Sequence, residues 1–267
     1  MKIVFYGAGN MASAIFEGII SSSLLNSHNI YLTNRSSEGQ LQDFQQKLDI
    51  NYSYDDDELL TDADYVFLAT KPYDFDALSE RIKDKIQPGN HFVSIMAGVP
   101  INQIKNKLQM QNPIARIMPN TNAQVQQSVT GITFSDTFDA GHKAELFKIL
   151  NSFGTALEVE EEKLHQVTAI TGSGPAFLYY MYEQYIKAAI HMGLDKEHVD
   201  AAVRNLIIGT GHMLEASELD IEQLRENITS KGGTTKAGLD ALKKYPVEDI
   251  FTDCLEQAIK RSKELSE

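Results

Sequence analysis

The stretch that decides the fold lies at the start of the chain and reads IVFYGAGNMA, residues 3–12. A short apolar run is followed at once by the pattern G-x-G-x-x-A, and residues 11–25 then show helical periodicity. A strand, a glycine turn and a helix in this order are typical of a dinucleotide-binding βαβ unit. The two glycines allow a tight turn and a close approach of the backbone to a pyrophosphate, and the small Ala12 lets helix and strand pack closely.

Further short runs rich in β-branched and aromatic residues predict strands at residues 30–32, 65–69, 92–95, 114–118 and 130–134. They are apolar on both faces, as strands of a covered parallel sheet are, and helical stretches such as residues 100–108 lie between them. This alternation predicts an α/β fold, a Rossmann-type doubly wound parallel sheet that binds NAD(P), over residues 1–160.

The pattern changes at the acidic run EVEEE, residues 158–162, after which only helical segments follow. They carry more apolar surface than a domain of this size buries comfortably, so we expect the domain to pair with a second copy of the chain. The sequence therefore predicts an all-helical dimerisation domain over residues 161–267. Its expected helices span residues 164–192, 198–216, 221–228, 235–244 and 247–265.

The composition narrows the class of protein. The chain has 267 residues and a net charge of −13, with no basic stripe, which argues against nucleic acid or a membrane surface as a partner. No apolar run is long enough to span a membrane, and the chain start leaves no room for a signal peptide. The single Cys254 indicates a reducing compartment, so we expect a cytoplasmic protein with a small-molecule substrate.

The end of the second predicted strand bears on the choice of coenzyme. An NAD-specific site places an Asp or Glu there, whereas this chain has Asn34, Arg35 and Ser36. A guanidinium with neighbouring amide and hydroxyl groups suits a 2′-phosphate, which favours NADPH over NADH, although NADH stays possible. The alternative is that Arg35 is a solvated loop charge.

Two further strand ends lie near the expected nicotinamide half, because ligands of open α/β sheets bind beyond the carboxyl ends of the strands. These are residues 69–72 and 94–98, where Lys71 could equally be a surface lysine. The expected cofactor-binding residues are Gly7, Ala8, Gly9, Asn10, Met11, Asn34, Arg35, Ser36, Ala69, Thr70, Lys71, Pro72, Met96, Ala97 and Gly98.

A second glycine loop, TSKGGTT at residues 229–235, lies between two predicted helices. Its backbone amides and the following helix N-terminus suit a small anion such as a carboxylate, and the alternative is simple helix capping. The stretch TGSGPA, residues 171–176, allows close approach either of a ligand or of a neighbouring helix.

Other chemistries find less support. The seven histidines show no metal-ligand spacing, so no metal site is expected. No nucleophile elbow of the G-x-S-x-G type occurs. The acidic residues 55–58 are interpreted as a solvated loop before a helix whose N-terminus their charge stabilises.

Seven motifs occur in order from residue 7 to about residue 240: GAGNM (7–11), NR (34–35), FLATKP (67–72), SIMAGV (94–99), RIMPNT (116–121), TGSGPA (171–176) and the loop 229–235. Together they resemble the pyrroline-5-carboxylate reductase family, and the last two are far more specific than the first. The resemblance implies a Rossmann-type domain and a helical domain that forms an interlocked homodimer, often assembled into decamers. It also implies reduction of L-1-pyrroline-5-carboxylate to proline by NADPH or NADH.

The resemblance also implies roles in the second loop. It places Thr235 as the catalytic residue beside the imine nitrogen, and the substrate-binding residues are Ser173, Ser230, Gly232, Gly233, Thr234 and Thr235. Two positions depart from the family pattern: Lys231 replaces a proline, and Asp56 stands where an asparagine often contacts the adenine ribose. A nearby acid would weaken the preference for NADP.

Two other functions fit parts of this pattern. One is another NADP-dependent two-domain dehydrogenase of the 3-hydroxyacid type, which needs a catalytic lysine on the long helix, where residues 177–192 offer only Lys187 near the far end. The other is a non-catalytic NADPH sensor, which would leave the loop at 229–235 without a purpose.

Overall fold

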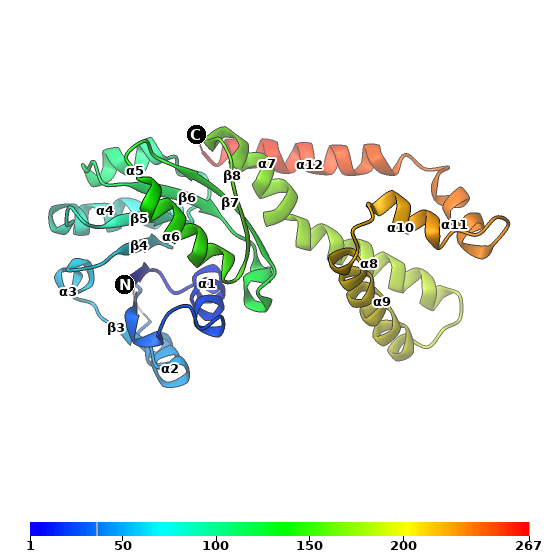
Figure 1. The fold of residues 1–267 in the computed structure, drawn as a ribbon, viewed down its shortest axis with the longest axis horizontal. Coiled ribbons are helices and arrows are strands. Elements are labelled where there is room, and N and C mark those ends of the chain that lie inside the picture. Colours follow the sequence, from blue (N-terminus) through cyan, green and yellow to red (C-terminus); the bar gives the residue numbers. More distant parts are fainter. Residues whose placement is uncertain (36, 267) are drawn as a thin grey trace. The chain divides into compact units, whose positions relative to one another are not determined.

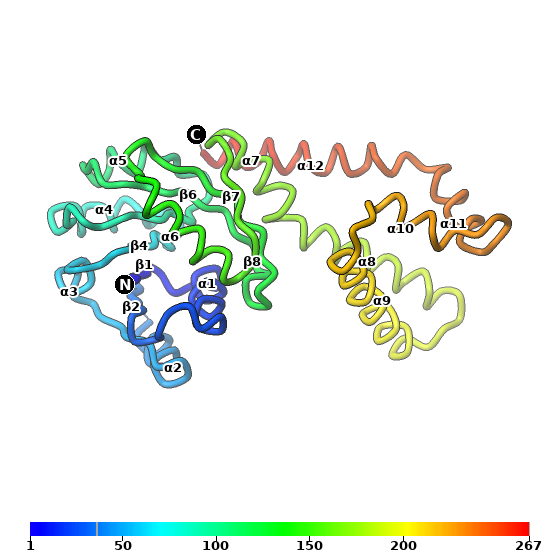
Figure 2. The backbone as a smooth tube through the Cα atoms, in the orientation of Figure 1, coloured from blue at the N-terminus to red at the C-terminus, as the bar shows by residue number. Residues whose placement is uncertain are grey.

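The structure is a computed structural model that describes residues 1–35 and 37–266. The chain divides into two compact units. Unit 1 contains Met1–Ser173 and the chain from Glu256 onward, and unit 2 contains Gly174–Leu255. Figure 2 traces the backbone through both. The sequence-based domain limits, 1–160 and 161–267, stay a prediction.

Unit 1 is built on one eight-stranded sheet with the strand order β3-β2-β1-β4-β5-β6-β7-β8. The neighbours from β3 to β6 pair in parallel, and β7 then pairs antiparallel with β6 and parallel with β8. The strands are β1 (Ile3–Tyr6), β2 (Ile30–Thr33), β3 (Asn51–Tyr52), β4 (Tyr65–Leu68), β5 (His91–Ser94), β6 (Ile114–Met118), β7 (Ser128–Phe134) and β8 (Gly154–Glu158).

Helices cover both faces of this sheet, as Figure 1 shows. Alternate residues of β1 point to opposite faces: Ile3 and Phe5 join one apolar core, and Val4 and Tyr6 join the other. The first core is completed by α1 (Asn10–Ser21), α2 (Glu38–Leu48) and α6 (Ala140–Asn151). The second is completed by α3 (Asp56–Leu60), α4 (Phe75–Ile82) and α5 (Ile101–Leu108). The predicted doubly wound α/β fold is confirmed.

The structure adds strands that the sequence did not predict. β3 is only two residues long, too short to give a periodic signal. β8 includes Glu158, the first residue of the acidic run at which the pattern changes. β7 runs against β6, so the sheet is parallel only in part. Antiparallel pairing needs only a short connection, and residues 119–127 supply one between β6 and β7.

Residues 164–192, expected as a long helix whose start is interrupted by the glycine stretch 171–176, are indeed interrupted near that stretch. α7 (Leu164–Val167) passes into a π-helical turn, Thr168–Gly172, before α8 (Gly174–His191) begins. The remaining short 3₁₀ helices span Ser27–Asn29, Pro72–Asp74, Lys83–Lys85, Thr121–Val125 and Glu161–Lys163.

Unit 2 is all-helical. It contains α8, α9 (Lys196–Ala216), α10 (Ile221–Asn227), α11 (Thr234–Leu242) and the start of α12 (Val247–Glu264), whose end belongs to unit 1. Many of its large apolar side chains are exposed, and α8 and α9 line a groove of about 890 Å³. None of the described helices is long and apolar enough to cross a membrane.

Candidate active site

The glycine turn after β1 is shaped by its neighbour in the sheet. Gly7 has φ = +119°, and a Cβ added there would lie 2.3 Å from the Ala69 carbonyl oxygen at the end of β4. Only glycine fits this conformation and this contact. Gly9, in contrast, has no atom within 4 Å of the position of a Cβ, so the space above it is open. The turn therefore leaves room for a group to approach the backbone at Gly9.

Gly9 is also the N-cap residue of α1, and no side chain caps this helix. The amides of the first turn of a helix have no partner within the helix and, with the helix dipole, attract an anion. Gln40 of α2 donates from Nε2 to the Ala8 carbonyl oxygen at 2.9 Å, which holds the loop. The loop containing Gly7, Ala8, Gly9, Asn10 and Met11 thus has the geometry expected of a phosphate cradle.

Asn34 and Arg35 follow β2. The Asn34 Oδ1 atom accepts hydrogen bonds from the Ser37 amide at 3.0 Å and the Tyr54 hydroxyl at 3.1 Å, so this side chain is fixed. The Arg35 side chain is 76% exposed and forms an ion pair with Asp74. Ser36, the third residue expected to bind cofactor here, lies outside the described residues.

Asp56, interpreted above as part of a solvated loop, is in fact buried. Its Oδ2 lies 3.1 Å from Arg81 Nε, and its Oδ1 accepts a hydrogen bond from the Tyr6 hydroxyl at 3.3 Å. Burial, followed by the charge of Asp56, raises the pKa of Tyr6. Asp55 does cap α3 as expected, accepting from the amides of the next two residues. The Asp56 charge is therefore turned inward and matched by Arg81, so it repels a 2′-phosphate less than its position in the sequence suggests.

The two other predicted strand ends meet each other. The Thr70 hydroxyl lies 3.6 Å from the Met96 sulfur, which joins the loop after β4 to the loop after β5. Gly98 has φ = +77°, and a Cβ there would lie 2.2 Å from the Leu265 carbonyl oxygen. The chain beyond α12 therefore presses against the loop that contains Ala97. Lys71 and Pro72 are exposed at the same edge of the sheet.

Ser173 follows the π-helical turn directly. Its amide donates to the Thr168 carbonyl at 2.8 Å, and Asn120 Nδ2 at the end of β6 donates to the Thr171 carbonyl at 2.9 Å. Four residues after Thr171 stands Pro175, which has no amide proton to donate, so Asn120 satisfies the carbonyl that this proline leaves without its usual helical partner. Through this bond the end of β6 holds the segment that carries Ser173.

The second glycine loop lies in unit 2 and precedes α11. Gly232 has φ = +74°, Gly233 is the N-cap, and the Gly233 amide donates to the Ser230 carbonyl at 3.1 Å. No side chain caps α11, so its first-turn amides are available to an anion, as at α1. Thr234 and Thr235 are exposed in the single chain.

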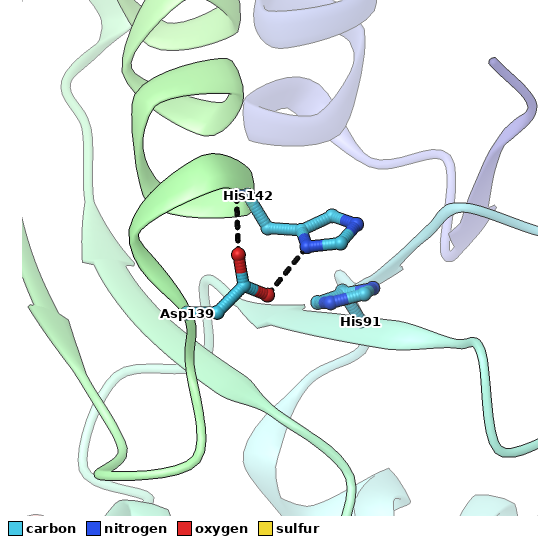
Figure 3. A group of neighbouring side chains, drawn as sticks. All are labelled: His91, Asp139 and His142. Atoms are coloured by element: carbon cyan, nitrogen blue, oxygen red, sulfur yellow. Dashed lines mark hydrogen bonds and ion pairs between the residues drawn. The ribbon is translucent and has the colours of Figure 1, made fainter.

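A cluster that the sequence did not predict lies in unit 1, at the opposite end of β5 from Met96. His91, Asp139 and His142 lie together, and Figure 3 shows the Asp139 carboxylate bonded both to the His142 ring and to its amide. The two imidazole rings stack with their centroids 3.8 Å apart. About 50 residues separate His91 from the other two in sequence, so no spacing rule could find them.

One potential ligand atom of each of these residues lies within 4.8 Å of the others, but part of their hydrogen-bonding capacity is already engaged within the protein. Nδ1 of His91 faces the Gly89 carbonyl at 3.1 Å, and Nδ1 of His142 faces Asp139 at 2.5 Å. The nitrogen left on each ring has its lone pair in the ring plane, and these planes are inclined by only 24°. Both Asp139 oxygens are also engaged in hydrogen bonds. The predicted absence of a metal site stays a prediction.

Comparison with known proteins identifies related families and individual relatives. Residues 2–98 match a family model described as NADP oxidoreductase, coenzyme F420-dependent, and residues 161–265 match one described as pyrroline-5-carboxylate reductase dimerisation. Pyrroline-5-carboxylate reductases of Staphylococcus haemolyticus and Staphylococcus aureus are 60% and 62% identical, over 100% of this chain and 98% of theirs.

Solved structures agree. A pyrroline-5-carboxylate reductase from Coxiella burnetii is 31% identical with a TM-score of 0.93, and one from Plasmodium falciparum with NADP bound is 28% identical with a TM-score of 0.86. Each comparison covers 100% of this chain and 98% of the other.

The sheet, the glycine loop and the helical unit define a dinucleotide-dependent oxidoreductase that forms homo-oligomers. Full-length identity of this degree then settles the family. The chain belongs to the pyrroline-5-carboxylate reductase family.

Family membership speaks against the two other functions considered above. The one lysine that a 3-hydroxyacid dehydrogenase could use, Lys187, is 61% exposed on α8 and paired with Glu183.

Proposed function

We propose that this enzyme transfers a hydride from NADPH, with NADH as a possible substitute, to the C=N bond of L-1-pyrroline-5-carboxylate. The product is L-proline, so the reaction is the final step of proline biosynthesis. The observation that carries this proposal is the presence of two uncapped helix N-termini suited to anions, one at the start of α1 and one at the start of α11, in a chain of this family. A dinucleotide pyrophosphate and a substrate carboxylate are the two anions that the reaction requires.

The residues of unit 1 fit the dinucleotide. The open backbone at Gly9 and the uncapped α1 suit a pyrophosphate, and Arg35 is the cation placed to receive a 2′-phosphate. The loops after β4 and β5, from Ala69 to Pro72 and from Met96 to Gly98, would hold the nicotinamide half. When bound, the cofactor supplies the hydride.

The loop of unit 2 supports substrate binding. We assign the carboxylate of the substrate to the loop that contains Ser230, Gly232, Gly233 and Thr234, and we assign Ser173 to substrate binding as well. Lys231 is exposed and adds a cation at this loop, where the family usually has proline. A positive charge here would strengthen the attraction for a carboxylate.

Thr235 is assigned the catalytic position. Its hydroxyl oxygen would accept a hydrogen bond from the protonated imine nitrogen and fix the angle at which hydride reaches carbon. A cyclic imine can arrive protonated, so its carbon is electrophilic without a strong acid. The hydroxyl of threonine is a poor general acid at neutral pH, so positioning is the contribution expected of it.

Thr235→Ala should therefore lower kcat/KM for the imine about tenfold or more while the Kd for NADPH stays nearly unchanged, because orientation of the two reactants supplies much of the rate. Thr235→Ser, which keeps the hydroxyl, is the matched control and should retain most of the activity. Steady-state kinetics and calorimetric titration of NADPH measure the two quantities. Equal losses in kcat/KM and in NADPH affinity would contradict the role.

The reaction itself is tested by NADPH oxidation with pyrroline-5-carboxylate beside a panel of 2- and 3-keto acids. Activity on the imine alone supports the proposal. Activity confined to a keto acid would favour a hydroxyacid dehydrogenase, and binding without turnover would favour a sensor.

The assembly proposed is a homodimer built by unit 2, assembled further into decamers, in the cytoplasm. Exposure of Thr235 in the single chain supports a site that the partner copy helps to enclose.

A further inference from the structure

Arg35 and Asp74 meet across the end of β1. The strands β2 and β4 flank β1, and Thr33, Tyr6 and Leu68 stand level at their carboxyl ends. Arg35 follows β2 by two residues, Asp74 lies in the 3₁₀ turn after β4, and Arg35 Nη1 donates to Asp74 Oδ1. Because Gly7 continues from the middle strand, the ion pair spans the same sheet edge as the phosphate cradle.

The two partners are held unequally. The Asp74 side chain is 26% exposed, its amide donates to the Lys71 carbonyl at 2.9 Å, and it directly precedes α4, whose N-terminus stabilises a negative charge. The Arg35 side chain is 76% exposed, and among the described residues its ion-pair partner is Asp74. Asp74 is therefore the better anchored member of the pair, and Arg35 is the member more open to a ligand.

We propose that Asp74 is a specificity-determining residue that competes with the 2′-phosphate of NADPH for Arg35. This inference rests on the proposed use of NADPH. Binding of a 2′-phosphate must either displace the carboxylate or share the guanidinium with it, and a phosphate and a carboxylate repel each other at that range. NADH has a hydroxyl in place of the phosphate and does not need Arg35. Asp74 thus lowers the affinity for NADPH relative to NADH, and so reduces the preference for NADPH that Arg35 creates.

Asp56 does not compete for Arg35, although it is the acidic residue that departs from the family's sequence pattern. Arg81 and Tyr6 engage its carboxylate inside the protein. Asp74 is the acid whose partner is the exposed arginine.

Asp74→Asn tests the competition, because asparagine keeps an oxygen that can accept from Arg35 and removes the charge. The Kd of NADPH should fall about two- to fivefold, the effect of an exposed ion pair, while the Kd of NADH stays unchanged. Adenosine 2′,5′-bisphosphate against 5′-AMP repeats the comparison without the nicotinamide. Calorimetric titration of the full-length protein, without imine, measures each Kd.

Two further variants sharpen the test. Asp76→Asn is the matched control, because Asp76 is exposed, paired with Lys107 on α5 and only two residues away. It removes the same charge and should leave the ratio of the two Kd values unchanged. In an Arg35→Ala background, Asp74→Asn should change NADPH affinity much less, since the contested group is gone and only the direct repulsion between carboxylate and phosphate is left.

The proposal is overturned if Asp74→Asn weakens NADPH binding, if it changes the Kd of both coenzymes equally, if Asp76→Asn gives the same gain or if the effect is undiminished without Arg35. In those cases dinucleotide binding and the proposed reaction would still stand. A wild-type protein that bound neither dinucleotide would overturn the proposed function as well.

Discussion

His91 shows how the environment of a single residue sets a pH dependence. Burial lowers the pKa of its imidazole, and the neighbouring His142 lowers it further. The unfolded chain, with an ordinary histidine pKa of about 6.5, therefore takes up the proton more readily than the folded one. The neutral His91 ring therefore makes its full contribution to the free energy of unfolding above pH 6.5. That contribution is lost as the pH falls below 6.5 toward the lower pKa of the folded state.

Asp139 acts in the same direction at lower pH. Its hydrogen bonds from the His142 ring and amide lower its pKa from 3.8 to about 2. A carboxylate with a lowered pKa stabilises the folded state at pH values above its ordinary pKa. It loses that contribution as the pH falls toward 2. His91 and Asp139 therefore both make the fold less stable as the pH falls.

We therefore expect the Tm to fall between pH 7.5 and pH 5.5, and His91→Phe to reduce this fall, because phenylalanine cannot titrate and suits the neighbouring rings of Tyr65 and Phe138. Differential scanning calorimetry across this range measures the slope. The control is His198→Asn, which changes a histidine whose side chain is 92% exposed. A slope in His91→Phe equal to that of the wild type would contradict this account.

Among the elements of unit 1, β6 is joined to its neighbours by a buried charge. Arg116 is only 3% exposed, and its Nη1 donates to Glu161 Oε1 at 3.2 Å. The same oxygen accepts from the Ile101 amide at the start of α5. Burial lowers the pKa of Arg116, and the charge of Glu161 opposes that effect. One carboxylate therefore ties the strand to α5.

Glu161→Ala should lower the free energy of unfolding by about 3 kcal/mol, because it leaves a buried guanidinium without its counter-charge. Glu161→Gln, which still offers an oxygen to both donors, should cost less. Urea denaturation measures both values. If alanine and glutamine had the same small effect, the ion pair would not hold these elements together.

At the scale of the whole molecule, unit 2 leaves much apolar surface exposed in the single chain. Leu206, Ile208 and Met213 of α9 are more than half exposed, and Val199 and Val203 are its buried apolar residues. Such surface is normally covered by a partner, which agrees with the dimerisation family matched by this part of the chain.

Ile208→Glu should therefore reduce the assembled mass seen by light scattering and lower activity with it, since Ile208 is 57% exposed and lines the groove between α8 and α9. A charge placed in a covered apolar interface is costly. Leu24→Glu in unit 1, where Leu24 is 41% exposed, is the control and should leave the mass unchanged. An unchanged mass in Ile208→Glu would show that this face is not the interface.

Some features of this protein could be determined from its sequence alone. The apolar runs of β1, β4, β5 and β6 and the glycine loop at Gly7 are local patterns, because burial on both faces and a positive φ each demand particular residue types in a short stretch. The helical second half followed from periodicity in the same way.

Only the tertiary structure decided the rest. The reversal of β7, the inward turn of Asp56 toward Arg81, the meeting of His91 with His142 and the ion pair between Arg35 and Asp74 each join residues far apart in the chain. Local patterns report which face of an element is buried, but they do not report which distant charge or ring fills the space beside it. Those partners are set by packing and by the pairing of buried charge, and both depend on the whole fold.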